Sequence, residues 1–269
     1  METYRLKNIV IFILLLLNLF LLGLTVHLRL QQRRTDQTLE QQLIRLFENN
    51  GITLPEDLEA DATSLTPMTT SRSLSDEAAI AAYLLGQEVT GEDQGGGIYT
   101  YTGTHGVVQF RSSGAFDYAP DLPPTVGDPE AFCQTFLETF GCRALSSSFS
   151  DGTGTFQAVR QVAGSDVYNC TISLHFAKWQ LISASGTWVS TATTTPLPQP
   201  VFTAADALNR FLGYRSTSGA VCNAVTSVQC VYVLQSPSPS TLQLTPQWQV
   251  ETDTYRYYVD CITGEVQRA

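Results

Sequence analysis

The chain closes with TPQWQVETDTYRYYVDCITGEVQRA (residues 245–269), a stretch typical of paired β-strands. Side chains alternate between the two faces of a strand, so Trp248 and Val250 share one face. Residues 260–264, DCITG, predict a tight turn in which Gly264 adopts backbone angles that other residues avoid. We therefore expect Trp248 to be buried under the last sheet of the chain.

Upstream of this ending, a helix followed by β-rich sequence occurs three times. Short turns such as Thr102-Gly103 join the β-rich stretches and favour antiparallel pairing. The sequence predicts an α+β fold whose ectodomain repeats a helix-plus-antiparallel-meander unit. The expected helix starts and stops are Ser73 or Ser75 with Gly86, Asp128-Pro129 with Gly141, and Thr203 and Asp206 with Gly213.

A long apolar segment lies near the N-terminus. Between Lys7 and Arg29 there are 21 residues without Asp, Glu, Lys or Arg, NIVIFILLLLNLFLLGLTVHL. At ~1.5 Å per residue this segment reaches ~30 Å, the thickness of the hydrocarbon core of a bilayer. A cleaved signal peptide has a shorter apolar region that ends in small residues, which the sequence after Gly23 lacks. We expect an uncleaved single-pass transmembrane helix at residues 8–28.

The charges around this segment suggest its orientation. Arg5 and Lys7 favour a cytoplasmic tail at residues 1–7, although three arginines follow the span. Long domains cross the membrane largely regardless of such charges, so we expect a protein of the cell membrane with an extracellular C-terminal domain. The expected segments after the span are a stalk helix and linker (29–70), a first ectodomain part (71–198) and a C-terminal module (199–269).

Composition and motifs argue against several classes of function. After residue 34 the chain carries 10 basic and 24 acidic side chains, which would repel nucleic-acid phosphates. The sequence has no G-x-S-x-G, H-E-x-x-H or phosphate-binding loop, and neither His105 nor His175 has a second ligand at metal-binding spacing. We therefore expect no catalytic residue, no metal site, no cofactor and no nucleic-acid partner.

The six cysteines leave two interpretations open. They could form disulfides outside the membrane, or they could be buried free thiols. No C-x-x-C spacing occurs, so the sequence does not support a zinc or thioredoxin-type site. The cysteines are Cys133, Cys142, Cys170, Cys222, Cys230 and Cys261.

The two ends of the chain resemble the YycI/YycH-type regulatory proteins, YycI especially. The start, LKNIVIFILLLLNLFLL, is similar to the membrane anchor of that family. The ending also resembles PepSY-type modules, and the six cysteines depart from the YycI pattern. The residues that carry the resemblance at the C-terminus are Pro246 and Trp248, then Tyr257-Tyr258-Val259-Asp260 and Thr263-Gly264-Glu265-Val266.

This resemblance implies a non-enzymatic, regulatory function. Such proteins regulate an essential two-component sensor histidine kinase in the Gram-positive envelope through contacts between membrane helices. The implied partners are the kinase and a YycH-like co-regulator. Two alternatives are an anchored envelope protein with a PepSY-like inhibitory or ligand-sensing ectodomain, and a structural adaptor.

Asn18 is the candidate contact within the apolar span. A polar amide in lipid gains free energy when it meets a polar group on another helix, about 0.6–2 kcal/mol. The alternative is that Asn18 is a single tolerated amide. If the contact exists, residues one helical turn away should share the surface: Leu14, Leu15, Leu21 and Leu22.

Overall fold

The computed structural model describes residues 15–22, 24–25, 39–56, 58–60, 62–86, 88–191, 195–197, 199–238 and 241–269. Its architecture is α+β, with a large mixed sheet of 14 strands. Residues 15–22 and 24–25 are helical, but no helix among the described residues is both long and apolar enough to cross a membrane. The expected transmembrane helix at 8–28 therefore lacks support from the structure, and most of that range lies outside the described residues.

Three helices begin at the expected caps. Ser73 accepts a hydrogen bond from the N–H of Asp76 at the start of α2 (Leu74–Leu85). Asp128 caps α3 (Pro129–Phe140) in the same way. Thr203 caps α4 (Ala204–Ser218). It exchanges hydrogen bonds with Asp206, the third residue of that helix, as a capping box does.

The expected stop of α4 at Gly213 is wrong, because the helix continues to Ser218 and ends at Gly219. A glycine inside a helix costs only about 1 kcal/mol relative to alanine. Tertiary packing offsets that cost, since the ring of Tyr214 lies 5.9 Å from the ring of Tyr257 on the sheet.

Antiparallel strands follow each helix, as the repeated unit predicts. They are β2 (Thr90–Gly95), β3 (Ile98–Gly103), β4 (Gly106–Arg111) and β5 (Ala115–Pro120) after α2; β6 (Cys142–Ser150), β7 (Thr153–Val162), β8 (Ser165–Ala177) and β9 (Gln180–Thr187) after α3; and β11 (Val225–Ser238), β12 (Thr241–Thr252), β13 (Arg256–Asp260) and β14 (Val266–Arg268) after α4, with the short β1 (Met68–Thr70) and β10 (Thr195–Pro196) beside β12.

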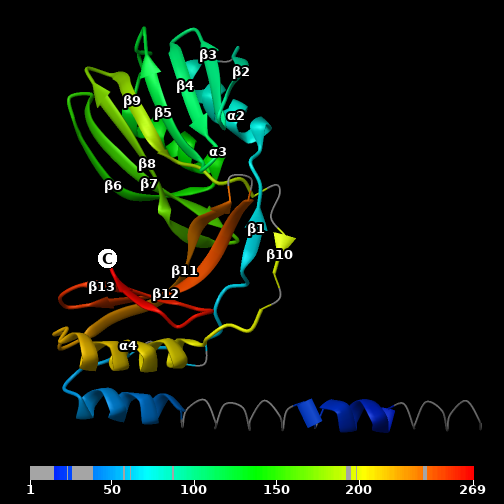
Figure 1. The fold of residues 1–269 in the computed structure, drawn as a ribbon, viewed down its shortest axis with the longest axis vertical. Coiled ribbons are helices and arrows are strands. Elements are labelled where there is room, and N and C mark those ends of the chain that lie inside the picture. Colours follow the sequence, from blue (N-terminus) through cyan, green and yellow to red (C-terminus); the bar gives the residue numbers. More distant parts are fainter. Residues whose placement is uncertain are drawn as a thin grey trace, which may run out of the picture.

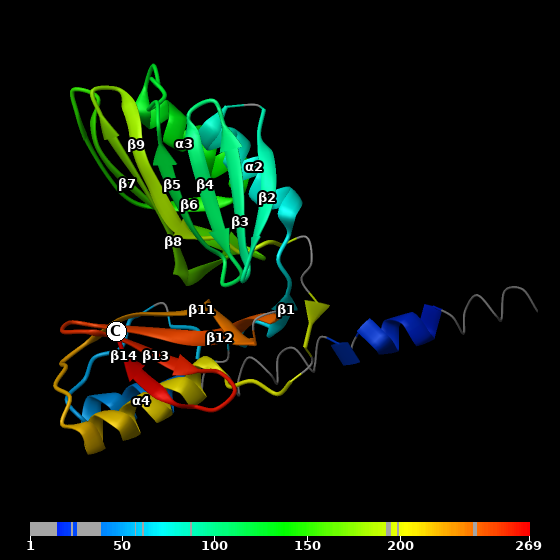
Figure 2. The same ribbon diagram turned by 45° about the horizontal axis from the view of Figure 1, so that its top comes forward.

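The strands form two lobes (Figures 1 and 2). The upper lobe holds α2, α3 and an antiparallel sheet in the order β2-β3-β4-β5-β9-β8-β7-β6. The lower lobe holds α4, with β12 between β11 on one edge and β1 and β13 on the other. A parallel pairing of Val167 on β8 with Tyr232 on β11 joins the lobes and makes the whole sheet mixed.

Each lobe has its own core on one face of its sheet. In the upper lobe, α2 and α3 pack on the sheet through fully buried rings such as Phe110 and Phe136. In the lower lobe, α4 covers β12 and β13, and Trp248 is buried as predicted. The helical residues 39–49, expected as part of a stalk, contribute Leu43 and Phe47 to this lower core and lie beside α4 (Figure 1).

Candidate functional site: a polar groove between the lobes

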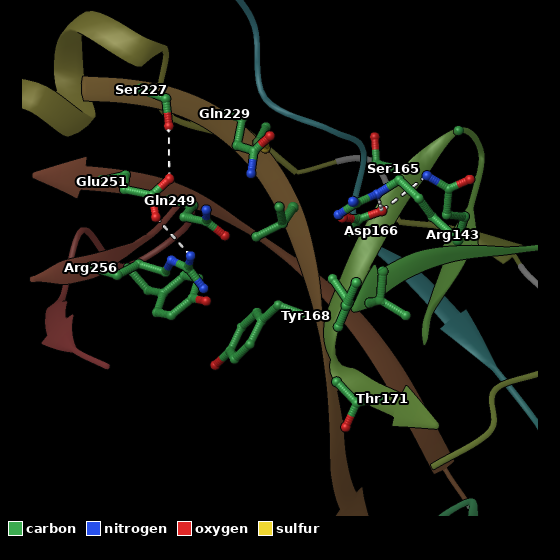
Figure 3. A pocket seen from close by; sticks show the side chains of 17 residues that line it. Arg143, Ser165, Asp166, Tyr168, Thr171, Ser227, Gln229, Gln249, Glu251 and Arg256 are labelled. Carbon is green, nitrogen blue, oxygen red and sulfur yellow. Dashed lines mark hydrogen bonds and ion pairs between the residues drawn. The ribbon is translucent and has the colours of Figure 1, made fainter. Parts of the chain in front are cut away.

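Strand alternation creates a groove where the lobes meet. On β11, β12 and β13, every second residue faces α4, and these residues are apolar. The residues between them therefore point to the opposite face of the sheet. The same alternation turns Val159 and Thr171 away from the upper core. The two outward faces flank one groove of about 730 Å³ (Figure 3). Its polar side chains are Arg143, Gln161, Ser165, Asp166, Tyr168, Thr171, Ser227, Gln229, Gln249, Glu251, Arg256 and Tyr258.

Each wall of the groove carries one ion pair. On the upper wall, Arg143 contacts both carboxylate oxygens of Asp166, and Gln161 Nε2 donates to Oδ1 of Asp166 at 3.0 Å. The hydrogen bond to Asp166 raises the pKa of Arg143 above its ordinary value. The carboxylate of Asp166 is thus already held by two donors.

On the lower wall, Arg256 Nη2 lies 2.7 Å from Oε1 of Glu251, and Ser227 Oγ donates to Oε2 of Glu251 at 3.3 Å. The hydrogen bond from Arg256 lowers the pKa of Glu251 below its usual range. With one arginine and one carboxylate on each wall, the charges of the groove cancel at neutral pH. Figure 3 shows the two pairs on opposite sides.

Two tyrosines form an aromatic surface between these pairs. The rings of Tyr168 on β8 and Tyr258 on β13 are stacked, with centroids 4.1 Å apart and planes at 16°. Burial raises the pKa of both phenols, so both remain neutral hydrogen-bonding groups at physiological pH. Because the two residues belong to different lobes, their contact fixes part of the groove's shape.

Gln249 leaves hydrogen-bonding capacity unused in the groove. The residue is only 6% exposed and its side chain lines the groove. Within the described part of the chain, its amide has no hydrogen-bond partner. The buried side-chain atoms without a partner in the described part of the chain include Oε1 of Gln247 but no atom of Gln249, so the Gln249 amide is open to the groove. A ligand in the groove could hydrogen-bond this accessible amide.

The residues singled out at the C-terminus occupy different places. Trp248 donates from Nε1 to the carbonyl of Phe202 at 2.9 Å and packs in the lower core with Tyr257. The carbonyl of Pro246 accepts from the N–H of Cys261 at 3.1 Å. These three residues build the sheet, whereas Tyr258 alone of the C-terminal residues singled out from sequence lines the groove.

Asp260 and Gly264 form the expected turn. Asp260 Oδ1 accepts from the N–H groups of Ile262 and Thr263 at 2.8 Å each. Gly264 has φ +73°, and a Cβ there would lie 2.9 Å from the ring of Phe202. The turn therefore requires glycine on both conformational and steric grounds.

The proposed helix-contact residues lie away from this groove in sequence and structure. Asn18, Leu15, Leu21 and Leu22 belong to the helical residues 15–22, and the three leucines are exposed. Leu14 lies outside the described residues. Their role in contacting a partner stays a prediction.

All six cysteines are free thiols, which resolves the alternative left open by the sequence. Five of them are buried, and burial raises the pKa of Cys133 and Cys170 to about 12 each. These thiols are therefore poor nucleophiles, because the thiolate is the reactive form. Cys230 and Cys261 contact each other in the lower core, and this contact lowers the pKa of Cys230 while raising that of Cys261.

Sequence reasoning missed most of the groove. The alternation of glutamines and apolar residues in QWQV (247–250) and VQCV (228–231) indicated which side chains share a face. It could not indicate that this face meets Arg143 and Asp166 from the other lobe.

No protein-family model matches the sequence, and no curated protein matches it. Among solved structures, the chain is similar to the YpeB C-terminal domain of Bacillus megaterium, with 13% sequence identity and a TM-score of 0.38, over 74% of this chain and 98% of that one. It is also similar to an uncharacterized protein from Eubacterium rectale, with 10% identity and a TM-score of 0.39, over 81% of this chain and 85% of that one. Neither likeness assigns the chain to a family, so the resemblance to YycI stays a prediction.

Proposed function

We propose that the chain is a non-enzymatic envelope protein with a ligand-sensing or inhibitory ectodomain, and that it binds its partner in the groove between the lobes. The observation that carries this proposal is a large polar groove built by both lobes, which the side chain of Gln249 lines. The polar side chains around it are suited to recognition, because few directed groups set the orientation of a bound ligand.

The chemistry of the groove supports binding over catalysis. The charged side chains on its walls are paired: Arg143 with Asp166 and Arg256 with Glu251. His105 and His175 lie elsewhere, and the ring of His105 contacts the carbonyl of Leu122. The groove thus offers a surface for a neutral, polar ligand or polypeptide.

Site-specific photocrosslinking tests this proposal in cells that produce the protein. A benzophenone amino acid replaces Gln229, which is an exposed residue of the groove. The matched control replaces Val221, which is 68% exposed and lies outside the groove. We expect an adduct on irradiation with the probe at 229 and none with the probe at 221. Absence of an adduct at 229, or equal adducts at both positions, would show that the groove is not the contact surface.

The second candidate function is regulation of a two-component sensor histidine kinase through the membrane helix, together with a YycH-like co-regulator. The observation that favours it is the uncharged segment of 21 residues with Asn18 in its middle. In this proposal the N-terminus is cytoplasmic and the body of the chain lies outside the cell. Contacts of the anchor would then change kinase activity, and the ectodomain would position the anchor.

Asn18→Leu should weaken association of the full-length chain with the kinase by up to ~30-fold, equivalent to ~2 kcal/mol. The reason is that leucine cannot replace an interhelical hydrogen bond of the amide. Co-purification and a reporter of the kinase's target genes measure the effect. Phe20→Leu is the matched control, because it lies on the opposite side of the helix and should leave association unchanged. If Asn18→Leu binds as well as the unaltered chain, recognition lies outside this helix.

A further inference from the structure

One edge of β11 is open along the groove. Its other edge pairs with β12 continuously from Val228 to Gln235. On the open side, β8 pairs with β11 only at Tyr232. Among the described residues, no strand pairs with this edge ahead of Tyr232, at residues 228–231.

The protein itself shows that this edge accepts strand-like hydrogen bonds. The side-chain amide of Asn169 donates to the carbonyl of Leu234 and accepts from its N–H, both at 2.8 Å. Asn169 thus takes the place of a neighbouring backbone at that position. It also shows that both backbone groups of Leu234 point away from β12.

The period of two along a strand extends this pattern. If Leu234 directs its N–H and carbonyl to the open side, so do Tyr232, Cys230 and Val228. The pairing with β12 runs without a register shift through these residues. Tyr232 meets β8, which leaves the backbone groups of Val228 and Cys230 open.

Hollows lie on both faces of the sheet at this edge. The groove lies on the outer face, and a second hollow of about 310 Å³ lies on the core face. Ser165, Gln229 and Cys230 border both of them, so the open edge separates the two. The second hollow is lined by Glu59, Leu65 and Trp248, among others.

We infer that the open edge of β11 at Val228–Cys230 binds an extended polypeptide segment of a partner protein, which adds to the sheet as a strand between the two hollows. This inference rests on the proposed function of the groove and names its ligand class. Strand addition uses main-chain hydrogen bonds for affinity and alternate side chains for specificity. Such a segment directs successive side chains into the groove and into the second hollow.

The chemistry of the two hollows specifies the segment. In the groove, the accessible amide of Gln249 and a surface with balanced charge suit a polar, uncharged side chain such as an amide. In the second hollow, the exposed carboxylate of Glu59 suits a lysine or arginine. The net charge of −10 on the whole chain also favours a basic partner. The partner sequence is therefore an extended stretch that alternates polar with basic residues.

Val228→Pro tests the open edge directly. Proline removes the outward N–H of residue 228 but no hydrogen bond to β12, and prolines are tolerated on strand edges in this orientation. Val228→Thr is the matched control, because it keeps both the N–H and the β-branched shape. Melting temperatures of both variants show whether the lower lobe remains folded.

The probes are peptides selected from a phage-displayed library of random dodecapeptides on the full-length chain. We expect enriched peptides with alternating polar and basic residues, which bind Val228→Thr like the unaltered chain and Val228→Pro at least about tenfold more weakly. In the unaltered chain, bound peptide should protect the amides of Val228 and Cys230 from hydrogen exchange. N-methylation of alternate peptide amides should abolish binding, and N-methylation of the intervening ones should not.

Failure to enrich any peptide would overturn the inference, as would equal binding to both variants or protection of other amides. If Val228→Pro does not fold, the hydrogen-exchange and N-methylation results on the unaltered chain decide whether the peptide adds to β11 as a strand. A crosslinked adduct at residue 229 without strand addition would retain the proposed function of the groove and reject this inference. Absence of that adduct would reject the groove itself.

Discussion

Trp248→Ala should lower the free energy of unfolding by ~3–5 kcal/mol, as deletion of a large buried aromatic ring does. The residue is only 3% exposed and packs between α4 and the strands of the lower lobe. Its indole N–H also donates to the carbonyl of Phe202 at 2.9 Å, and alanine leaves that carbonyl without this donor. Urea denaturation of the purified chain measures the loss.

Trp179→Ala is the matched control for this variant. Trp179 lies at the turn between β8 and β9 and is 46% exposed, so much of its ring is already in water. We expect a loss of about 1 kcal/mol or less. If Trp248→Ala and Trp179→Ala reduce stability equally, Trp248 does not hold the lower core together.

Arg72→Met should lower the free energy of unfolding by a similar amount, ~3–5 kcal/mol near neutral pH, because it leaves a buried carboxylate without its partner. Glu77 is only 3% exposed. Arg72 contacts its two oxygens at 2.6 and 2.8 Å and donates to the carbonyls of Gly97 and Phe110. The pair ties the start of α2 to the sheet of the upper lobe.

The loss from Arg72→Met should depend on pH. Burial already raises the pKa of Glu77 above its ordinary value, and the hydrogen bond from Arg72 opposes that rise. Without Arg72 the pKa of Glu77 in the folded state rises further. A raised carboxyl pKa means that the folded state binds a proton more tightly than the unfolded chain, so stability increases as pH falls. Arg72→Met should therefore be less destabilising at pH 4.5 than at pH 7.5.

Two further variants isolate this effect. Arg111→Ala removes an exposed ion pair with Asp117 and should change stability by about 1 kcal/mol or less at either pH. Glu77→Gln in the Arg72→Met background removes the buried charge and should recover part of the loss at pH 7.5. A loss from Arg72→Met that is the same at pH 4.5 and pH 7.5, with no recovery by Glu77→Gln, would mean that packing and not charge explains it.

The starts of the helices could be predicted from sequence because a cap is a local structure. Asp128 and Thr203 hydrogen-bond backbone groups two or three residues ahead, so neighbouring residues contain all of the information. The turn at Asp260 and Gly264 is local in the same sense. The burial of Trp248 followed from strand alternation, which is also local.

What lay beyond sequence reasoning depends on residues far apart in the chain. The continuation of α4 past Gly213 depends on Tyr214 meeting Tyr257, 43 positions later. A stalk helix was expected within residues 29–70, but the packing of the helical residues 39–49 beside α4 was not.

The groove also combines a feature that the sequence predicts with one that only the tertiary structure decides. The alternation of residues 227–231 and 247–251 determined that polar side chains share one face of the lower sheet. Only the tertiary structure decided that this face meets Arg143, Asp166 and Tyr168, because one pairing of Val167 with Tyr232 and the amide of Asn169 join the lobes there. Alternation is a property of each strand alone, whereas the partner of a strand edge depends on how the whole chain folds.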